Sequence, residues 1–486
     1  MRETTQGERT WALSEQTDTT SNRQGISARM ADSLTASIQV VERTSAIPAP
    51  PESIYAWHER PGALVRLMPP WKEAAVLQRT GGVADGARTV LSVPLGPFNV
   101  RWVARHRNTV PGRQFVDEMV SGPFAHWVHL HKLLPVSDTM TSLHDRVEFR
   151  APLGPLGSIA NPWLRRQVER MLRYRHELLR DEFTQGMPRR PLTVAVTGAT
   201  GFIGSHLVRA LTTAGHSVRR IVRRHPASDD IVWDPARGEL DPRQLEGVGA
   251  VIHLAGASIS HRWTRQQKRR IRESRITSTR LLARTLARLA PKPAVLVSAS
   301  AVGYYGDRGD TLLDEQAPPG DDFLAEVGKA WEASADPARE AGIRVVHPRL
   351  GIVLSPAGGA LPLLSLPVRL GLGGRLGSGE QWMSWVALDD VLGVMRYAIE
   401  NDDLSGPVNL VGKPERNRDF IATLARVLHR PSAIPVPAFA IRAVAGEMAD
   451  ALVLASQRVE AAALGRSSYR MRYPELEGAL RHVLGR

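Results

Sequence analysis

The segment at residues 192–215 constrains the fold of this chain more than any other part of the sequence. It begins with an apolar run at Leu192–Val196, passes through glycines at positions 198, 201 and 204, and continues with apolar residues at helical spacing. Glycines in this arrangement permit a tight turn and let the backbone approach a ligand closely. The N-terminus of the helix that follows can hold a pyrophosphate. The segment therefore predicts a strand, turn and helix unit of a parallel sheet that binds a dinucleotide.

Length and composition indicate more than one folded domain. A chain of 486 residues exceeds the size at which a single core stops growing, about 250–300 residues. Hydrophobic residues make up 43% and charged residues 23%, as in ordinary globular proteins. Residues 1–35 are rich in Thr, Ser, Gln, Arg and Glu without apolar periodicity, so we expect a disordered tail there. The Pro- and Gly-containing stretch at residues 186–191 predicts a linker between two domains.

Hydropathy, cysteine content and charge exclude several classes of protein. The sequence has no secretory signal and no run of about 18 apolar residues, so we expect a cytoplasmic enzyme without a membrane span. The absence of cysteine rules out disulfides and cysteine-based metal sites; sites of His and carboxylate ligands remain open, and we predict no particular metal site. The formal net charge of +14 comes mainly from arginines spread over every segment. Since no nucleic-acid-binding motif accompanies this charge, we predict no nucleic-acid partner.

Residues 36–185 show the pattern of an α+β domain. Alternating residues at 36–47 predict a half-buried strand, and a short helix is expected at residues 51–58. Further strands are expected at residues 89–93, 100–106, 114–120, 126–134 and 140–149, before a long amphipathic helix over residues 162–183. This order, together with the stretch SGPFAHWVHLHKL at residues 121–133, resembles the START-like (SRPBCC, cyclase/dehydrase) helix-grip family. The resemblance implies a cavity between sheet and helix for an apolar ligand; the alternative is a packed module without a ligand.

Two arginines follow the second strand expected in the C-terminal part of the chain. That strand covers residues 216–222 and leads into Arg223 and Arg224, where an NAD-selective site usually carries an acidic residue for the ribose hydroxyls. Guanidinium groups pair with phosphate through bidentate, charge-assisted hydrogen bonds. The pattern favours NADP(H) over NAD(H); the competing explanation is that an arginine-rich chain simply exposes two more arginines.

The C-terminal part of the chain resembles the extended short-chain dehydrogenase/reductase (SDR) family. The resemblance rests on TGATGFIG at residues 197–204, GAVIHLAGA at 249–257, PAVLVSASAVGYYGD at 293–307 and VVHPRLGIVLS at 345–355. It implies an α/β Rossmann domain with a doubly wound parallel sheet over residues 192–430. Residues 431–486 resemble the C-terminal extension of the epimerase-like branch of this family, the NAD(P)-dependent epimerases and dehydratases. Beside Arg223 and Arg224, the cofactor contacts expected from the resemblance are Gly198, Thr200, Gly201, Phe202, Ile203, Gly204, Leu254, Ala255, Gly256 and Arg349.

The catalytic residues of the SDR family are only partly present. The resemblance places Ser300 at the position of the family's Ser, which orients the substrate oxygen. The family also uses a Tyr-x-x-x-Lys helix, in which the Tyr exchanges a proton with the substrate and the Lys holds the nicotinamide ribose. The corresponding helix, at residues 321–336, contains no Tyr, and counting back four from Lys329 gives Ala325. The remaining candidates for catalysis are Tyr304, Tyr305, Glu326 and Lys329.

Two further charged groups have both a functional and a structural interpretation. Arg275, in a basic segment at residues 261–288, either lies on a solvated helix face or anchors an anionic substrate or a cofactor phosphate. Asp389 and Asp390 precede an apolar helix, where an Asp is most often the N-cap.

These patterns predict an NADP(H)-dependent oxidoreductase or epimerase-like enzyme that acts on a small molecule, with the START-like domain binding or delivering an apolar substrate. Because the Tyr is absent, two other functions stay open. One is a non-catalytic NADP(H)-binding sensor, and the other is a lipid- or isoprenoid-binding protein on a degenerate SDR scaffold. The patterns name neither the substrate nor an oligomeric state.

Overall fold

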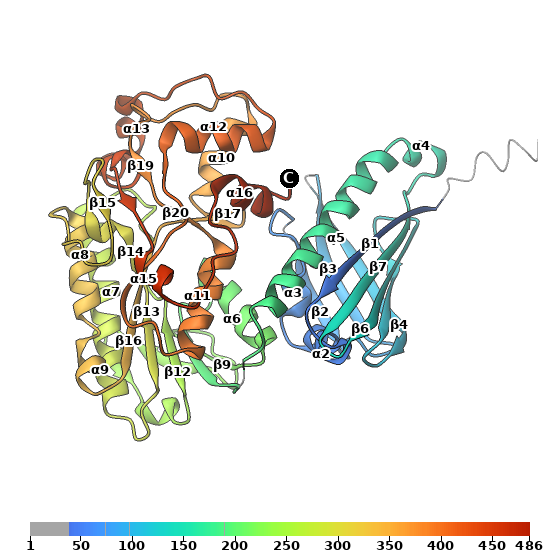
Figure 1. The fold of residues 1–486 in the computed structure, drawn as a ribbon, viewed down its shortest axis with the longest axis horizontal. Coiled ribbons are helices and arrows are strands. Elements are labelled where there is room, and N and C mark those ends of the chain that lie inside the picture. Colours follow the sequence, from blue (N-terminus) through green and yellow to red (C-terminus); the bar gives the residue numbers. More distant parts are fainter. Residues whose placement is uncertain (1–37, 73, 97, 189) are drawn as a thin grey trace, which may run out of the picture.

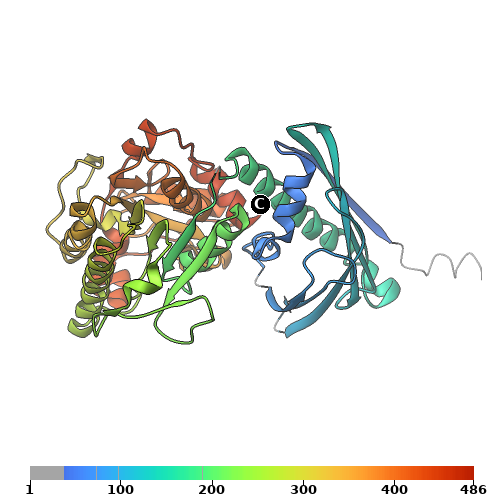
Figure 2. The same ribbon diagram turned by 90° about the horizontal axis from the view of Figure 1, so that it is seen from below.

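The computed structural model describes residues 38–486 apart from residues 73, 97 and 189, and shows two folded units side by side (Figures 1 and 2). The disordered tail expected at residues 1–35 lies outside the described residues. The N-terminal unit, coloured blue to blue-green in Figure 1, leads through the end of a long helix into the C-terminal unit, coloured green to red. No helix in the described part of the chain is long and apolar enough to cross a membrane.

The N-terminal unit is an antiparallel sheet of seven strands that curves around one long helix, as a helix-grip fold requires (Figure 2). The strands pair in the order β1-β7-β6-β5-β4-β3-β2. The helix α5 buries Leu172, Leu178 and Phe183 against the concave face of the sheet. The elements are β1 (Gln39–Ile47), α2 (Pro51–Glu59), α3 (Ala63–Arg66), β2 (Ala75–Thr80), β3 (Arg88–Leu95), β4 (Phe98–Val110), β5 (Gln114–Ser121), β6 (His126–Ser137), β7 (Met140–Arg150), α4 (Gly154–Ser158) and α5 (Asn161–Thr184).

Alternation along the strands explains most of this agreement with the sequence. On β6, Trp127, His129, His131 and Leu133 are buried while the residues between them are half-buried or exposed, because successive side chains of a strand point to opposite faces. The edge strand β2 was not expected, since none of its side chains is buried and its sequence shows no clear alternation. Two of the four inward side chains on β6 are therefore histidines, an arrangement that the hydrophobic pattern alone does not explain.

The C-terminal unit is a doubly wound parallel sheet with helices on both faces, which confirms the Rossmann fold. Its strands follow the order β10-β9-β8-β12-β13-β16, and β21 pairs with β16 at the far edge. The main elements are β8 (Thr193–Thr197), α6 (Phe202–Ala214), β9 (Ser217–Val222), β10 (Ile231–Asp234), β11 (Glu239–Leu240), β12 (Ala250–His253), α7 (Arg265–Ala287), β13 (Val295–Ser298), β14 (Ser300–Ala301), α8 (Phe323–Ala333), α9 (Asp336–Glu340), β16 (Arg344–Leu350), β17 (Ile352–Ser355), β18 (Gly358–Gly359), α10 (Leu361–Arg369), β20 (Trp385–Ala387), α11 (Leu388–Glu400), β21 (Gly406–Leu410) and α12 (Asn417–Leu428). The chain ends in α13 (Ala438–Ala445), α15 (Ala462–Arg466) and α16 (Leu476–Leu484).

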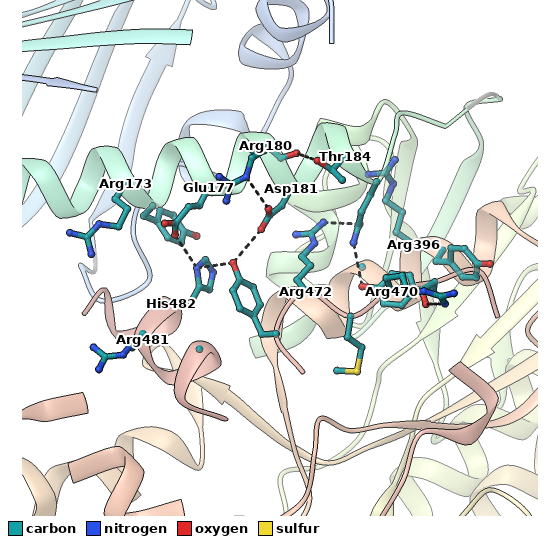
Figure 3. A pocket seen from close by; sticks show the side chains of 18 of the residues that line it. Arg173, Glu177, Arg180, Asp181, Thr184, Arg396, Arg470, Arg472, Arg481 and His482 are labelled. Carbon is teal, nitrogen blue, oxygen red and sulfur yellow. Dashed lines mark hydrogen bonds and ion pairs between the residues drawn. The ribbon is translucent and has the colours of Figure 1, made fainter. Parts of the chain in front are cut away.

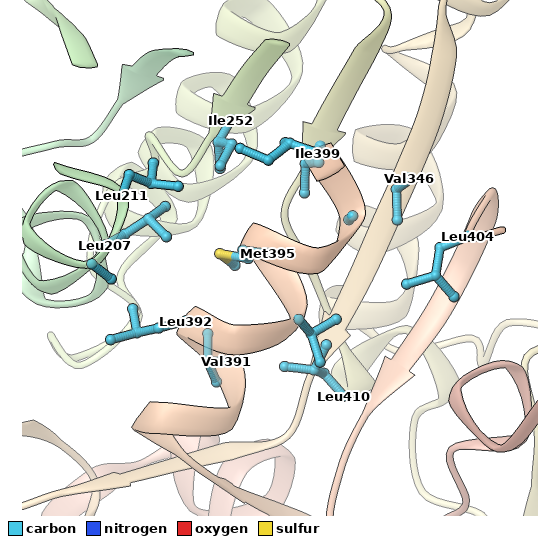
Figure 4. Packing of buried hydrophobic residues seen from close by; sticks show 14 of the residues in the cluster. Leu207, Leu211, Ile252, Val346, Val391, Leu392, Met395, Ile399, Leu404 and Leu410 are labelled. Carbon is cyan, nitrogen blue, oxygen red and sulfur yellow. The ribbon is translucent and has the colours of Figure 1, made fainter. Parts of the chain in front are cut away.

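The core of this unit lies between its central strands and two helices, α6 and α11. Figure 4 shows Leu207 of α6 and Met395 of α11 packed over the strands that carry Ile252 and Val346. All four side chains are buried almost completely, and burial of each such side chain contributes roughly 1.5–3 kcal/mol. The apolar spacing seen in the sequence thus fixes which face of α6 packs against the sheet. The N-terminus of α6 directly follows the glycine loop.

The two units share a buried ion-pair cluster centred on Glu182 of α5. Its carboxylate lies 2.5 Å from Nη1 of Arg66 on α3 and 2.9 Å from Nη1 of Arg396 on α11. Burial alone would raise the pKa of Glu182, but the two guanidinium groups outweigh it and leave the pKa lowered. Because Arg396 belongs to the C-terminal unit, this cluster joins the long helix of one unit to the core helix of the other.

A second set of polar contacts lines a pocket of about 860 Å³ between the units (Figure 3). Nε2 of His482 on α16 lies 3.1 Å from Asp389, and its Nδ1 faces Glu177 of α5 at 3.9 Å. The hydroxyl of Tyr473 lies 2.9 Å from Nδ1 of His482 and donates to Asp181 of α5 at 3.2 Å. Eight arginines also line the pocket, but five of them already donate hydrogen bonds to a carboxylate, to backbone carbonyls or to the side-chain amide of Gln185.

The expected N-cap at Asp389 or Asp390 is wrong. The residue that precedes α11 is Ala387, and no side chain caps this helix. Asp390 instead accepts hydrogen bonds from the backbone amides of Arg472 and Tyr473, at 2.7 and 3.0 Å. Burial raises the pKa of Asp390 to about 6. The acidic pair therefore holds the C-terminal segment, an interaction between residues more than 80 positions apart that no local sequence rule can detect.

We expect the contacts of His482 to make stability depend on pH. Burial would lower the pKa of His482, but Asp389 and Glu177 outweigh it and raise the pKa to about 9. A histidine in the unfolded chain titrates near 6.5. The stabilisation of the fold by protonated His482 is therefore complete below about pH 6.5 and is lost as pH rises through about 9. The melting temperature of His482→Gln should lie below that of the wild type at pH 6.5, and the two should converge near pH 10. The exposed control His261→Gln should match the wild type at every pH.

Candidate active site

The glycine loop between β8 and α6 has the geometry of a pyrophosphate cradle. Gly198 adopts a φ of +66°, and a Cβ there would lie 2.8 Å from the backbone carbon of Leu254. A Cβ on Gly204 would lie 2.1 Å from the carbonyl oxygen of Gly198. Gly201 differs, since a Cβ there would meet only one protein atom within 4 Å, and the residue is exposed. Gly198 and Gly204 are thus required by the fold. A Cβ on Gly201 would meet only the carbonyl oxygen of Gly198, at 3.2 Å, and the residue lies exposed at the N-terminus of α6, where no side chain caps the helix.

The other residues expected in the loop surround this opening. Thr200 is exposed, and Phe202 and Ile203 are half-buried at the start of α6. The first amides of a helix have no intrahelical acceptor, and they add to the positive end of the helix dipole. The loop therefore presents free N–H donors and a side-chain-free surface to an anionic group.

Arg223 and Arg224 lie directly after β9, the strand that pairs with β8 in the sheet. Both residues are exposed, and neither forms an ion pair with any of the described residues. Arg220, three residues earlier on β9, is instead paired with Asp230 through two hydrogen bonds of 2.8 and 2.5 Å. Arg223 and Arg224 are thus the unpaired guanidinium groups beside the expected ribose position.

The end of β12 forms a further wall of the candidate nucleotide site, beside the glycine loop. Leu254 and Ala255 donate their backbone amides to Oγ1 of Thr197, at 3.1 and 3.2 Å, which ties this strand end to the glycine loop. A Cβ on Gly256 would lie 3.2 Å from Cζ of Arg275. Arg275 donates to the carbonyl oxygen of Ala257 at 3.0 Å, and burial lowers its pKa to about 10. Arg275 is therefore not on a solvated helix face; its guanidinium group packs against Gly256 and supports the chain that follows β12.

Ser300 belongs to a buried network at the end of the central strands. Its Oγ donates to Oε1 of Glu332 on α8 at 2.6 Å. Glu332 also accepts two hydrogen bonds of 2.8 Å from Arg349 of β16, and Arg349 donates to the hydroxyl of Tyr305 at 2.9 Å. The Tyr305 hydroxyl in turn donates to Asn409 at 2.7 Å. The network joins α8, β16 and β21 around Ser300.

The contacts in this network do not fit the cofactor-binding role expected for Arg349 or the catalytic role expected for Tyr305. The side chain of Arg349 is 3% exposed and uses four N–H donors on Glu332, Tyr305 and the carbonyl oxygen of Glu315. Four of its five N–H donors are therefore engaged inside the protein, and its burial leaves little room for a cofactor phosphate, so the geometry gives it a positioning role. Tyr305 is fully buried, and burial raises its pKa to about 12. Its hydroxyl is engaged on both sides and does not face a substrate.

The other catalytic candidates occupy different positions. Tyr304 is half-buried, its ring lies 3.6 Å from Cζ of Arg349, and its hydroxyl makes no hydrogen bond with the described residues. Glu326 and Lys329 are both exposed on α8, and Glu326 lies 3.9 Å from Arg272 of α7. The structure thus brings Ser300, Tyr304 and the buried network together and leaves Glu326 and Lys329 on the outer surface of α8.

Sequence reasoning missed Glu332, Glu315 and Asn409. The inward face of α8 carries Ala325, Gly328 and Glu332 at helical spacing, and an acid that continues a face of small residues is a signal of a buried charge. Asn409 is the one polar residue within the buried end of β21. Glu315 accepts the backbone amides of Asn409 and Ala463, so it also ties the C-terminal segment to the sheet.

The N-terminal unit encloses a cavity of about 1070 Å³ between its sheet and α5. Most of its lining is apolar, including Leu67, Trp102, Trp127 and Met171. A polar group of His58, His106, Asp117, His129, His131 and Arg175 lines another part of the wall. This is the space that the START-like resemblance implies.

The same cavity extends to the C-terminal unit, where Pro356 and the α10 residues Pro362 and Leu366 line it. The segment before α10 also touches the glycine loop, because a Cβ on Gly358 would lie 2.7 Å from the ring of Phe202. One segment, residues 355–366, thus lies between the cavity of one unit and the glycine loop of the other.

Comparison with known proteins matches this architecture. The sequence model of the NAD dependent epimerase/dehydratase family matches residues 194–412. A model described as a domain of unknown function (DUF1731) matches residues 436–483, and one described as polyketide cyclase / dehydrase and lipid transport matches residues 47–173. An epimerase family protein of Mycobacterium bovis is 43% identical over 296 residues, which cover 60% of this chain and 98% of the relative. The protein YfhF of Bacillus subtilis is 37% identical over 300 residues, with 60% and 98% covered.

Two solved structures extend the comparison. A nucleoside-diphosphate sugar epimerase from Corynebacterium glutamicum has 35% identity and a TM-score of 0.76, and the match covers 92% of this chain and 90% of that one. The human epimerase family protein SDR39U1, solved with NADPH, has 32% identity and a TM-score of 0.55 over 60% of this chain and 99% of its own. Sequence and structure together show that this chain belongs to the NAD dependent epimerase/dehydratase family, with the DUF1731 extension after its Rossmann domain and a START-like domain before it.

Proposed function

We propose that the chain is an NADP(H)-dependent oxidoreductase or epimerase-like enzyme whose START-like domain binds an apolar substrate. The observation that carries the nucleotide part is the open glycine loop with two unpaired arginines beside it, Arg223 and Arg224. A structure of the relative SDR39U1 contains NADPH, which supports the same cofactor here. The apolar substrate is supported by the lining of the cavity and by its extension to α10.

The selectivity for NADPH should depend on the two arginines. Replacement of both Arg223 and Arg224 by Ala is expected to weaken NADPH binding by roughly 1–3 kcal/mol, the scale of hydrogen bonds to charged groups. NADH binding should stay nearly the same, because NADH lacks the 2′-phosphate. Isothermal titration with both nucleotides measures this, and Arg237→Ala, an exposed arginine nearby, serves as the matched control. Equal losses for the two nucleotides would contradict phosphate recognition by these residues.

The chemical step should depend on Ser300. The Ser300 hydroxyl donates its one proton to Glu332 in the structure, so this role requires it to turn to the substrate oxygen during the reaction. With NADPH and a panel of carbonyl compounds as substrates, Ser300→Ala is then expected to lower kcat about a hundredfold, the typical effect of removing a donor to a developing oxyanion. NADPH affinity should not change. If the free hydroxyl of Tyr304 supplies the proton, Tyr304→Phe causes a comparable loss and removes one limb of the pH–rate profile. Glu326→Gln, on the exposed side of α8, should leave the rate unchanged, and a large loss there would move the acid to Glu326.

The delivery of the substrate can be tested at α10. Leu366→Asp places a charge in the lining of the cavity beside the C-terminal unit, and we expect it to raise KM for an apolar carbonyl substrate without changing the Kd for NADPH. Leu363→Asp is the control, because Leu363 is exposed on the same helix but does not line the cavity. An unchanged KM in Leu366→Asp would separate the cavity from the reaction.

A sensor without catalysis is the second candidate. It is favoured by one observation, that the hydroxyls of Ser300 and Tyr305 are both engaged inside the protein while α8 lacks a tyrosine. Tight NADPH binding without hydride transfer to any compound of the panel would select the sensor.

A further inference from the structure

The polar part of the START-like cavity is built from three neighbouring strands that bring histidines and carboxylates onto one face. His129 and His131 lie two residues apart on β6, so both side chains point inward, and Asp117 faces them from β5. His129 and His131 are 2% and 4% exposed. The candidate ligand atoms of these three side chains all lie within 4.8 Å of one another. All three side chains also line the cavity.

The distances within the cluster suit coordination better than direct hydrogen bonding. Nε2 of His131 lies 3.4 Å from Oδ2 of Asp117, beyond the usual range for such a hydrogen bond. Zinc binds nitrogen and oxygen at about 2.0–2.2 Å in a tetrahedral arrangement, which places two ligand atoms about 3.3–3.5 Å apart. Nε2 of His129 is buried and makes no hydrogen bond in the described part of the chain; its nearest charged neighbour is Oδ2 of Asp145, at 3.6 Å. A buried polar atom of this kind indicates a missing partner.

His131 and Asp117 each have a second charged or polar neighbour at the atom that would not bind the metal, as metal ligands usually do. Nδ1 of His131 lies 2.8 Å from Oδ1 of Asp145 on β7, and the other oxygen of Asp117 lies 2.7 Å from Nε2 of His106 on β4. Carboxylate partners of this kind orient a metal-bound imidazole and increase its basicity. Asp145 also contacts His176 of α5 at 3.2 Å.

The charges around the cluster set the kind of ligand that fits. Two carboxylates, Asp117 and Asp145, face the cluster, and one guanidinium group, that of Arg175, lies 3.5 Å from Nδ1 of His129. A divalent cation would neutralise the two carboxylates, and Arg175 would then stand beside it as the positive partner of an oxygen ligand. Nitrogen ligands with one carboxylate select transition metals rather than Ca²⁺ or Mg²⁺.

We propose that Asp117, His129 and His131 form a binding site for a divalent metal ion of the zinc class in the wall of the START-like cavity. Three protein ligands leave a coordination position open, and the open position faces the cavity, where an oxygen atom of a bound ligand can occupy it. The site is independent of the nucleotide and of the reaction proposed for the C-terminal unit.

The test uses the full chain without an affinity tag, stripped with a chelator and then titrated with Co²⁺ and Zn²⁺. The wild type should bind one ion per chain by calorimetry, with visible absorption of Co²⁺ that reports nitrogen and oxygen coordination. Asp117→Asn and His131→Ala should lose this binding by at least a hundredfold. Asp145→Asn should weaken it about 10–100-fold, as expected of a residue that supports a ligand.

His126→Ala is the matched control, since His126 lies on the same strand but does not face the cavity; its metal affinity should equal that of the wild type. The wild-type titration decides even if a variant fails to fold. An absence of saturable Co²⁺ or Zn²⁺ uptake by the wild type would overturn the proposal and leave the cluster as a hydrogen-bonded His–Asp network. Uptake that persists unchanged in folded Asp117→Asn and His131→Ala would also overturn it, because the ion would then bind elsewhere.

Discussion

Gly201→Val is expected to weaken NADPH binding by about 3 kcal/mol or more, which is at least a hundredfold in Kd. The isopropyl group would stand at the exposed N-terminus of α6, where we expect the pyrophosphate to approach the backbone amides. Two or more charge-assisted hydrogen bonds would be lost, each worth roughly 1.5–3 kcal/mol. Fluorescence or calorimetric titration with NADPH measures the loss.

The structure supplies the controls for this substitution. Gly201 has a φ of −78° and ψ of 176°, which valine tolerates, and its Cβ would lie 3.2 Å from the carbonyl oxygen of Gly198, a contact that a small shift relieves; the variant should therefore fold, with a melting temperature slightly below that of the wild type. Gly465→Ala adds a methyl group in open space far along the sequence and should change neither stability nor affinity. Gly204→Ala should instead destabilise the fold, because its Cβ would overlap the carbonyl oxygen of Gly198. Normal NADPH binding by a folded Gly201→Val would move the nucleotide away from this loop.

Glu332→Gln is expected to lower the free energy of unfolding by about 3–5 kcal/mol, the cost of leaving the buried partner of an ion pair unpaired. Arg349 would keep its charge with its side chain only 3% exposed, and the amide cannot accept both of its hydrogen bonds as an anion does. Chemical denaturation monitored by circular dichroism measures the change.

A double variant separates the lost ion pair from a general effect of mutation on α8. Glu332→Gln combined with Arg349→Met removes the unpaired charge and should recover part of the stability. Glu326→Gln lies on the exposed side of the same helix and should stay within about 0.5 kcal/mol of the wild type. If Glu332→Gln were as stable as Glu326→Gln, the network would not support the catalytic end of the sheet.

The periodic parts of the fold could be predicted because they depend on neighbours along the chain. The long helix expected at residues 162–183 is α5, at Asn161–Thr184, and the expected strands of both units appear within a few residues of their positions. The glycine loop was likewise predictable, since its tight turn requires a left-handed backbone conformation at Gly198, which glycine adopts most readily. The edge strand β2 was missed, because a strand without a buried side chain has no alternation to detect.

The roles of the polar residues in the candidate site depend on tertiary contacts, and there the sequence was insufficient. The motif placed Ser300 and Arg349 near the catalytic end of the sheet, but only the fold shows that both side chains bond to Glu332 of α8. Helix periodicity alone did not identify Glu332 as an inward acid or Glu326 as an exposed one, because that choice depends on how α8 packs against β14 and β16.

The sequence by itself determined most element types and the position of the glycine loop, since these follow from hydrophobic period and backbone freedom, and its resemblance to two families gave the two fold classes. The tertiary structure alone decided which polar groups meet. Asp390 with the amide of Arg472, Glu182 with Arg396 and His131 with Asp145 are pairs from different elements of the fold. The energy of a buried charge depends on the partner that packing brings to it, and that partner is not encoded in the residue's own neighbourhood along the chain.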